Sequence, residues 1–196
     1  MIKIKNASKL FFLFLFSHLF LWTLIPSISN INLPLDTIEA LAWGSNLEWG
    51  FNKHPPLSAV AVEFFYFVFG ANDWAYYLLS QIFIVITFFY VWKLSKEIFE
   101  NKIFALISVL ILESIFFFNF TTPEFNVNVS QLPFWAMTVY FFWKSLQTNK
   151  KTFWFLFGIC SALGFLSKYL FVYILASLFL YLIFNLKKYK NQIKNY

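Results

Sequence analysis

The sequence contains no arginine, and charge of either sign is scarce. Only 12% of the 196 residues are charged, whereas an ordinary soluble chain carries about 25%. The missing arginine argues against a nucleic-acid-binding protein, because such proteins favour the bidentate contacts of arginine with bases and phosphates. A single cysteine, Cys160, excludes an intramolecular disulfide. No segment is polar enough to form a separate soluble domain.

Hydrophobic residues make up 60% of the chain and aromatic residues 24%. So little charge cannot cover a water-facing surface, and the apolar runs approach the ~20 helical residues that cross a bilayer core. Six runs qualify: Leu10–Ile28, Trp74–Trp92, Ile103–Phe120, Gln131–Leu146, Phe153–Ser167 and Tyr169–Leu186. We therefore expect an all-α polytopic membrane protein with about six transmembrane helices.

A seventh apolar stretch, Pro55–Gly70, is shorter and carries Glu63 near its middle. Lysine is enriched in short cytoplasmic loops beside membrane spans. If this stretch lies flat at the outer interface, all four lysine clusters are cytoplasmic; if it crosses, the second and third clusters move outside. The clusters are Lys3, Lys5 and Lys9; Lys93, Lys96 and Lys102; Lys144, Lys150 and Lys151; and Lys187, Lys188, Lys190 and Lys194. The lysines thus predict an interfacial helix and two cytoplasmic termini.

The predicted topology divides one membrane domain, residues 1–196, into loops of different character. Residues 29–70 form the first outer loop with juxtamembrane helices, residues 121–130 form the second outer loop, and residues 187–196 form a basic cytoplasmic tail. Six of the nine acidic residues then lie on the outer side: Asp36, Glu39, Glu48, Glu63, Asp73 and Glu124. The outer loops are therefore where we look for a polar site.

The first outer loop contains a pair of carboxylates at a predicted helix start. After Pro34, the pattern predicts a short helix from Thr37 to Leu47. Asp36 would lie at its N-terminus, where free N–H groups stabilise an anion. Asp36 and Glu39 would share one face of the first turn. A purely structural alternative, a plain N-cap with a capping-box-like glutamate, stays open.

Three basic side chains are candidates for binding a phosphate. Lys53 and His54 stand at the membrane surface just before paired prolines, and Lys168 separates two apolar runs at another outer junction. A lone Lys-His pair at an interface also fits a snorkelling anchor, and a lone lysine fits a turn. The cations indicate a phosphate site only when they are taken with the second outer loop.

That second loop brings a carboxylate, Glu124, to the same depth as Asp36. Asn126 and Asn128 follow, and their amides suit orienting Glu124 or binding hydroxyl groups. Three outer elements that carry carboxylates, lysines and amides indicate one polar site at the membrane surface.

Other features inside the apolar runs have plainer interpretations. Glu113 marks a bundle interior or pathway, because an ionised carboxylate in a membrane needs a partner; a neutral, hydrogen-bonded Glu113 is the alternative. His18 fits a packed residue better than a ligand. Gly158 and Gly164 predict close helix packing.

The outer segments resemble the family 39 glycosyltransferases, which are GT-C membrane enzymes related to protein O-mannosyltransferases and lipid A aminoarabinose transferases. The resemblance is carried by LDTIEALAWG at residues 35–44, WGFNKHPPL at 49–57, PEFNVN at 123–128 and GFLSKY at 164–169, in the order and spacing of the family. It implies a GT-C-like fold with flat juxtamembrane helices in the first outer loop, which the lysine pattern predicts separately.

The resemblance also implies roles for catalytic carboxylates, donor-phosphate cations and supporting amides. In that order these are Asp36, Glu39 and Glu124; Lys53, His54 and Lys168; and Asn126 and Asn128. Asp36 would be the general base on an acceptor, which attacks the anomeric carbon of a polyprenyl-phosphate sugar while lipid phosphate leaves. The acceptor class, whether lipid, glycan or protein, stays open.

The resemblance also bears on cofactors and location. Some relatives bind a divalent metal near this site, but two histidines and scattered acids do not establish one in this sequence. The expected location is a bacterial inner membrane, and no nucleic acid is expected as a partner.

Alternatives to an active enzyme follow from length. Typical members are more than twice as long, so a truncated product, a fragment and one part of a split enzyme all stay open. The alternative function is a non-catalytic membrane protein that binds lipid phosphate or assembles with a partner subunit. A transporter rests only on Glu113 and the number of spans.

Overall fold

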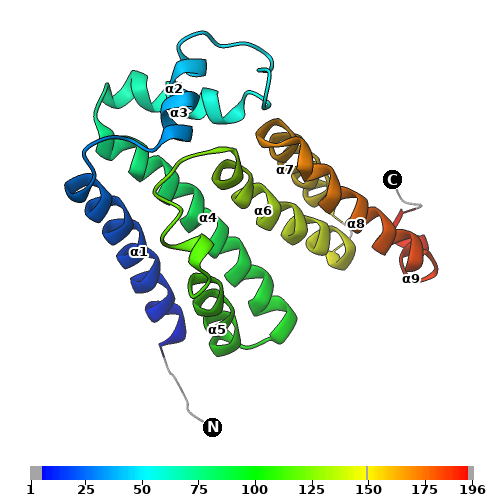
Figure 1. Cartoon of the computed structure of the whole chain (residues 1–196). Helices are drawn as coiled ribbons and strands as arrows, with labels where there is room; N and C mark the ends of the chain where they lie inside the picture. Colours follow the sequence, from blue (N-terminus) through cyan, green and yellow to red (C-terminus); the bar gives the residue numbers. More distant parts are fainter. Residues whose placement is uncertain (1–5, 149, 194–196) are drawn as a thin grey trace.

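The computed structural model describes residues 6–148 and 150–193, and regular structure within these ranges is entirely helical (Figure 1). The helices are α1 (Ala7–Ser29), α2 (Leu35–Gly44), α3 (Leu57–Phe69), α4 (Asp73–Phe99), α5 (Lys102–Glu113), α6 (Val127–Thr148), α7 (Lys151–Ser167), α8 (Val172–Phe184) and α9 (Leu186–Ile193). Short 3-10 turns, η1 (Phe116–Phe118) and η2 (Tyr169–Phe171), follow α5 and α7. The expected all-α class is confirmed.

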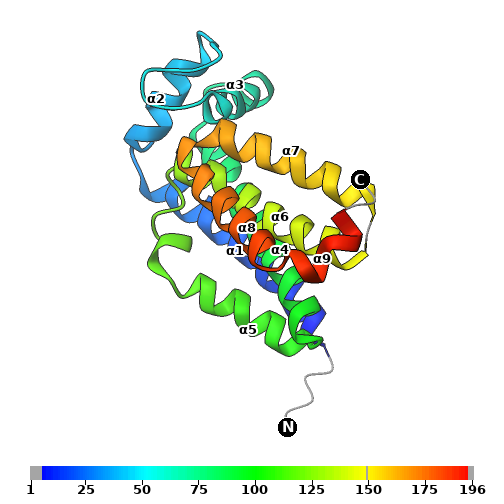
Figure 2. The ribbon, with the colours of Figure 1, turned by 90° about the vertical axis from the view of Figure 1, so that its right-hand side faces the viewer.

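The centre of the bundle is α4, which packs against α1, α5 and α6, while α6 also packs against α7 (Figures 1 and 2). Aromatic side chains fill these contacts. Phe11 of α1 stacks on Trp92 of α4 with ring centroids 4.4 Å apart, and both side chains are buried. Tyr140 and Phe141 of α6 form a second cluster with Cys160 of α7.

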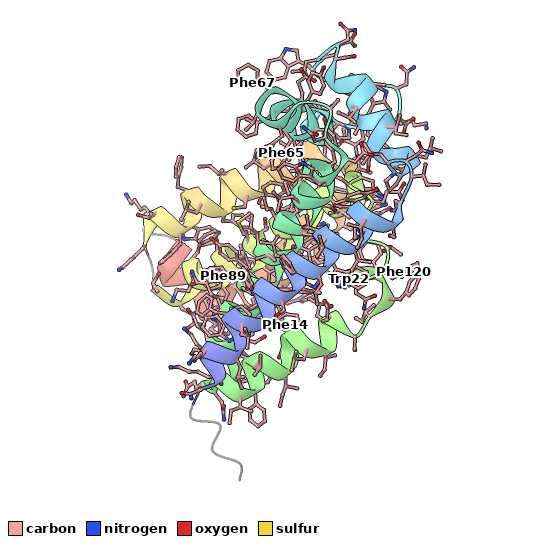
Figure 3. All side chains as sticks on the ribbon, turned by 90° about the vertical axis from the view of Figure 1, so that its left-hand side faces the viewer. Phe14, Trp22, Phe65, Phe67, Phe89 and Phe120 are labelled. Carbon is pink, nitrogen blue, oxygen red and sulfur yellow. The ribbon has the colours of Figure 1, made fainter. Side chains whose placement is uncertain are left out.

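Two helices of the described chain, α1 and α4, are long and apolar enough to cross a membrane. On α1, Phe12, Phe16 and Phe20 are 53%, 65% and 52% exposed. Phe67 and Phe120 also project from the surface (Figure 3). Large exposed apolar faces of this kind fit lipid better than water.

The predicted spans Leu10–Ile28 and Trp74–Trp92 lie within α1 and α4. The predicted span Ile103–Phe120 is wrong in its second part, because α5 ends at Glu113. The Asn119 side chain donates to the carbonyls of Glu113, at 2.6 Å, and Ile115, which satisfies acceptors at the helix end. Since α5, α7 and α8 have 12, 17 and 13 residues, the count of six spans stays a prediction.

Helices α2 and α3 lie together at one end of the bundle, where α3 runs across the other helices (Figures 1 and 2). The α5–α6 loop and the α7–α8 junction face the same end. The start of α1, the α4–α5 and α6–α7 connections and α9 lie at the opposite end (Figure 1). The lysine clusters map to that opposite end, apart from Lys3, Lys5 and Lys194, which lie outside the described residues. Helix α9 covers much of the expected tail 187–196, and residues 194–196 also fall outside.

Candidate functional site

The first turn of α2 fixes the position of Asp36. The helix starts at Leu35 and ends at Gly44, rather than running from Thr37 to Leu47. Pro34 occupies the N-cap position with φ −60° and ψ 152°, and no side chain caps the helix from that position. The interpretation of Asp36 as a plain N-cap is therefore wrong, because Asp36 lies inside the first turn.

The α5–α6 loop binds this first turn. Glu124 Oε1 accepts a hydrogen bond of 3.1 Å from the backbone N–H of Asp36, where a carboxylate is favoured by the helix dipole. Asn126 Nδ2 donates to Asp36 Oδ2 at 3.3 Å, and Thr37 Oγ1 donates to the Phe125 carbonyl at 3.1 Å. Two outer segments predicted to share a site thus contact each other directly.

Asn126 also starts the next helix. Its Oδ1 accepts hydrogen bonds from the backbone N–H groups of Asn128, at 2.9 Å, and Val129, at 3.1 Å. This is the N-cap arrangement that asparagine favours, and α6 accordingly begins at Val127. Because the cap fixes the oxygen, the amide nitrogen is held towards Asp36.

The α7–α8 junction joins the site through Lys168. The half-buried Lys168 Nζ donates to Asn128 Oδ1. Beside it, Ser167 Oγ donates to the Ser130 carbonyl at 3.3 Å. These contacts attach the α7–α8 junction to the first turn of α6, and they make Asn128 the residue that orients the Lys168 ammonium group.

Lys53 and Glu39 form an ion pair of 2.6 Å at the surface. The hydrogen bond with Glu39 and the charge of this carboxylate raise the pKa of Lys53. The Lys53 side chain is 63% exposed, and an exposed pair of this kind is worth little energy. Lys53 can therefore exchange Glu39 for a more strongly charged partner.

His54 lies beside Trp43, with ring centroids 5.8 Å apart, and Trp43 stacks on Phe51 at 5.1 Å. Burial and then the positive charge of Lys168 lower the pKa of His54 below its ordinary 6.5. The imidazole is consequently neutral at pH 7 and offers one N–H donor. The influence of Lys168 also shows that the Lys168 and His54 side chains share one region.

A small pocket lies between α2, α3 and the start of α6. Its lining consists of Asp36, Glu39, Ala40, Trp43, His54, Ser58, Asn126 and Val127. The cavity volume is about 10 Å³, which is the room that about one water molecule needs. Four of the predicted site residues therefore meet in one pocket.

The other predicted residues lie around it. Lys53, Asn128 and Lys168 are outside the pocket lining, although each contacts or influences a site residue. Glu124 lines a neighbouring groove of about 390 Å³ beside the C-terminal end of α1. Glu124 therefore lies between this groove and Asp36, and its hydrogen bond to the Asp36 N–H links the groove to the pocket.

Besides the apolar Ala40 and Val127, the site predicted from the sequence lacked two pocket residues, Trp43 and Ser58. Trp43 follows Asp36, Glu39 and Ala40 at the spacing i, i+3, i+4, i+7, which marks one helix face, so this signal was available. Ser58 is 1% exposed, and its Oγ has no hydrogen-bond partner in the part of the chain that the structure describes. Because buried polar atoms are usually paired, this hydroxyl is a group that a ligand can satisfy.

No group of three or more His, Cys, Asp or Glu side chains within residues 6–148 and 150–193 could hold a metal ion. The residues at the pocket therefore do not form a ligand set for the divalent metal considered from the sequence. We derive no catalytic step through a metal.

Lipid-facing apolar helices and a pocket of carboxylate, imidazole and amide groups at one end define a membrane protein that can bind a polar ligand at the membrane surface. The chain matches the family described as dolichyl-phosphate-mannose-protein mannosyltransferase over residues 53–196. It belongs to this family and is a membrane glycosyltransferase, which confirms the resemblance seen in the sequence. No curated protein and no solved structure matches the chain. The matched range contains Lys53, His54, Glu124 and Lys168, and begins after Asp36 and Glu39.

Proposed function

We propose that this glycosyltransferase moves a sugar from a polyprenyl-phosphate donor to an acceptor at the outer face of the membrane, with inversion at the anomeric carbon. The observation that carries the proposal is the pocket in which Asp36, Glu39, His54 and Asn126 meet. In a direct displacement, the base and the phosphate-binding groups lie on opposite sides of the anomeric carbon, so both must border one pocket.

Asp36 acts as the base on the acceptor. The hydrogen bond from Asn126 occupies Oδ2 of Asp36, so Oδ1 is available for the proton of the acceptor hydroxyl or amine. The acceptor atom bonds to the anomeric carbon while the bond from that carbon to the phosphate oxygen breaks, and its electron pair leaves on the phosphate. The acceptor proton ends on Asp36. One displacement of this kind inverts the configuration.

Cationic and hydrogen-bonding groups receive the phosphate. Lys168 and the N–H of His54 stabilise the negative charge that grows on the leaving group, and Lys53 joins them by leaving Glu39. Ser58 adds its unpaired hydroxyl, and it lies in the first turn of α3, where free N–H groups favour anions.

The two remaining carboxylates orient these groups. Glu124 holds the first turn of α2 through the Asp36 N–H, and Glu39 holds Lys53. Because the pocket has room for about one water, it must widen to admit the donor. One lining residue, His54, lies on the non-helical segment 45–56 between α2 and α3, which also carries Lys53.

We propose that the α2–α3 end faces outward, that residues 29–70 and 121–130 form the first and second outer loops, and that both termini are cytoplasmic. In a bacterial inner membrane this arrangement gives the enzyme a lipid-held donor and a lipid, glycan or protein acceptor from outside.

The test is transfer of labelled sugar from a polyprenyl-phosphate donor in membranes that contain the protein. Replacement of Asp36 by asparagine removes the base, so we expect a loss of ~10²–10⁴-fold in kcat. Asp73→Asn is the matched control, because Asp73 is an exposed carboxylate in α4 outside the pocket lining. The product should carry the anomeric configuration opposite to the donor. Wild-type turnover by Asp36→Asn would contradict the assignment of the base.

A further inference from the structure

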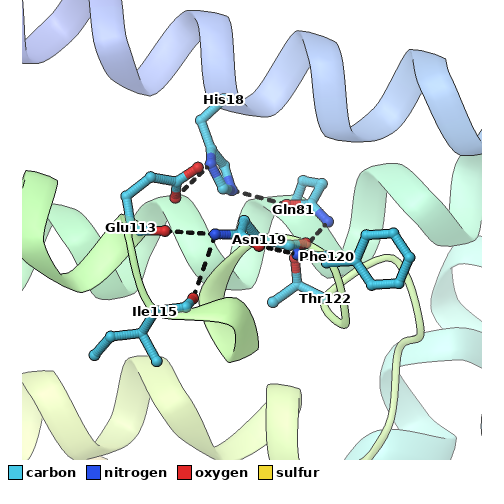
Figure 4. A network of polar contacts seen from close by, with 7 residues as sticks. All are labelled: His18, Gln81, Glu113, Ile115, Asn119, Phe120 and Thr122. Atoms are coloured by element: carbon cyan, nitrogen blue, oxygen red, sulfur yellow. Dashed lines mark hydrogen bonds and ion pairs between the residues drawn. The ribbon is translucent and has the colours of Figure 1, made fainter.

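A chain of buried polar contacts connects the interior of the bundle to the α5–α6 loop (Figure 4). His18, 3% exposed in the middle of α1, lies between two partners. Its Nδ1 is 3.0 Å from Glu113 Oε2 at the end of α5, and its Nε2 is 3.0 Å from Gln81 Oε1 in α4. The His18 side chain thus links α1 to both α4 and α5.

The contacts continue into the loop that carries Glu124. Gln81 Nε2 donates to Thr122 Oγ1 at 3.2 Å, and Ser80 Oγ donates to the Thr122 carbonyl. At the other side of the loop, Asn119 donates to the Glu113 carbonyl (Figure 4). Thr122 is fully buried and stands two residues before Glu124. The loop is therefore held at Asn119, by α5, and at Thr122, by α4.

The donors and acceptors of this chain have one consistent assignment. Thr122 Oγ1 donates to the Asn119 carbonyl at 2.8 Å, so it accepts from the Gln81 amide, whose oxygen then faces His18. His18 Nε2 must donate to that oxygen. His18 Nδ1 then faces Glu113 Oε2 at 3.0 Å.

Such a chain is costly to bury unless every member is bonded, because polar groups inside a membrane bundle lack water. Simple filling of the space between α1, α4 and α5 needs only apolar side chains. The polar chain adds orientation, since directional hydrogen bonds fix defined atoms of the α5–α6 loop. The loop atoms so fixed precede Glu124 and Asn126, the two residues that hold Asp36.

We propose that His18 is a positioning residue for sugar transfer: together with Gln81 and Glu113, it holds the α5–α6 loop so that Glu124 and Asn126 meet Asp36. This inference rests on the proposed function, because its effect on rate passes through Asp36. Lys168 and His54 lie on other segments, so the donor-binding side of the pocket does not depend on His18.

The first test compares transfer kinetics of His18→Ala with those of wild type. Displacement of a catalytic group by about 1 Å can cost on the order of 10²-fold, so we expect kcat to fall about ten- to hundred-fold with an unchanged donor KM. Thr87→Val is the control, because Thr87 is a buried hydroxyl of α4 that bonds the Phe83 carbonyl of its own helix. It should retain wild-type kinetics.

Two substitutions of Glu113 with similar volume distinguish the effect of its hydrogen bond from the effect of its size. Glu113→Gln should retain most of the rate, because its amide N–H can donate to His18 Nδ1. Glu113→Leu has similar volume without a polar group and should lose activity like His18→Ala. This pair decides the question if His18→Ala does not fold. Equal rates for the two Glu113 variants would overturn the proposal.

Double variants test whether His18 acts through Glu124. In a Glu124→Ala background, His18→Ala should cause a clearly smaller further loss of kcat than in wild type, because one of the two groups that it positions is gone. In a Lys168→Ala background, the full loss should persist. Full additive losses in both backgrounds would show that His18 does not act through this loop.

Hydrogen exchange gives a readout that does not depend on turnover. In detergent-purified protein, His18→Ala should speed amide exchange in residues 119–126 at least tenfold and leave α3 unchanged, and Thr87→Val should change neither. If wild type transfers no sugar while exchange responds, the proposed function fails and the hydrogen-bonded support of the loop stands. Unchanged exchange in 119–126 would overturn the inference about His18.

Discussion

Asn126 uses both ends of its side-chain amide, and this explains why an amide rather than a carboxylate stands at this position. The oxygen caps α6, and the nitrogen donates to Asp36. Replacement by aspartate keeps a good N-cap, but removes the donor and sets a second carboxylate against Asp36.

We therefore predict that Asn126→Asp unfolds within about 2 °C of the wild-type temperature while kcat falls ten- to hundred-fold, as about 1.4–2.7 kcal/mol of lost transition-state stabilisation implies. Thermal unfolding and transfer rates of the same preparation check this. Asn126→Ala, which loses both bonds, should be less stable as well as slow. An Asn126→Asp enzyme with wild-type kcat would show that the bond to Asp36 is irrelevant to transfer.

The lowered pKa of His54 predicts a pH dependence of donor binding. The ring is neutral at pH 7, and acidification below 6.5 adds a positive charge at the proposed phosphate site, so donor KM should fall as pH falls through the pKa. Lys168 is the second cause of the lowering, after burial. Lys168→Met should therefore move the inflection of KM to higher pH, part of the way towards 6.5, and raise KM at all pH values.

Donor KM measured between about pH 5 and 7.5 checks the sign for wild type, Lys168→Met and His54→Gln. The last variant should lack the inflection. If the inflection persists in His54→Gln, another group titrates; if it moves to lower pH in Lys168→Met, the electrostatic relation between Lys168 and His54 is wrong.

At the scale of elements, the turn between α7 and α8 depends on Gly164. A side-chain carbon added at Gly164 would collide with the ring of Phe171, which is completely buried. At Gly158, earlier in the same helix, nothing lies within 4 Å of such a carbon. The prediction of close packing is therefore confirmed for Gly164 and wrong for Gly158.

Gly164→Ala should cost about 1–3 kcal/mol by overpacking, and it should raise donor KM because η2 and Lys168 must shift. Gly158→Ala, the matched control, should be as stable as wild type or slightly more so, since alanine favours helix. Chemical unfolding and donor KM of the two variants provide the comparison. Equal stabilities would mean that Phe171 moves aside without cost.

Apolar run length predicted α1 and α4 because their extent is set by local hydrophobicity. It failed where a helix end depends on a particular side-chain contact. Helix α5 stops at Glu113, whose carbonyl accepts from the Asn119 side chain six residues later, and α2 starts at Leu35, where the Asp36 N–H meets Glu124, 88 residues away in sequence. The length of an apolar run carries no signal for either contact.

Some features of the candidate site were likewise predictable from the sequence, and others were not. Residue chemistry in three outer segments predicted that Asp36, Glu124 and Lys168 would lie near one another, and the structure brings them together. It did not predict that Glu124 would bind the backbone of Asp36 from a separate groove. Ser58 was missed because an unpaired hydroxyl is recognisable only when its surroundings are known.

At the scale of the whole molecule, the two ends of the bundle differ in chemistry. The α2–α3 end carries the pocket, and the opposite end carries the lysine-rich connections (Figure 1). Because lysines beside spans stay cytoplasmic, this polarity predicts that α3 does not cross the membrane and that the pocket faces outward. Cys160 is buried, and its replacement by alanine gives a background for single cysteines.

In that background, Asn52→Cys and Ala71→Cys flank α3 at exposed positions, and Gln147→Cys is exposed near the opposite end of α6. We expect a membrane-impermeant maleimide to label both flanking cysteines in intact cells, and Gln147→Cys only after permeabilisation. Labelling of Asn52→Cys and Ala71→Cys from opposite sides would mean that α3 crosses, which would place the lysine-rich α4–α5 and α6–α7 connections outside. Labelling of both only after permeabilisation would keep α3 at the interface but turn the pocket inward, and the acceptor would then have to be a cytoplasmic molecule.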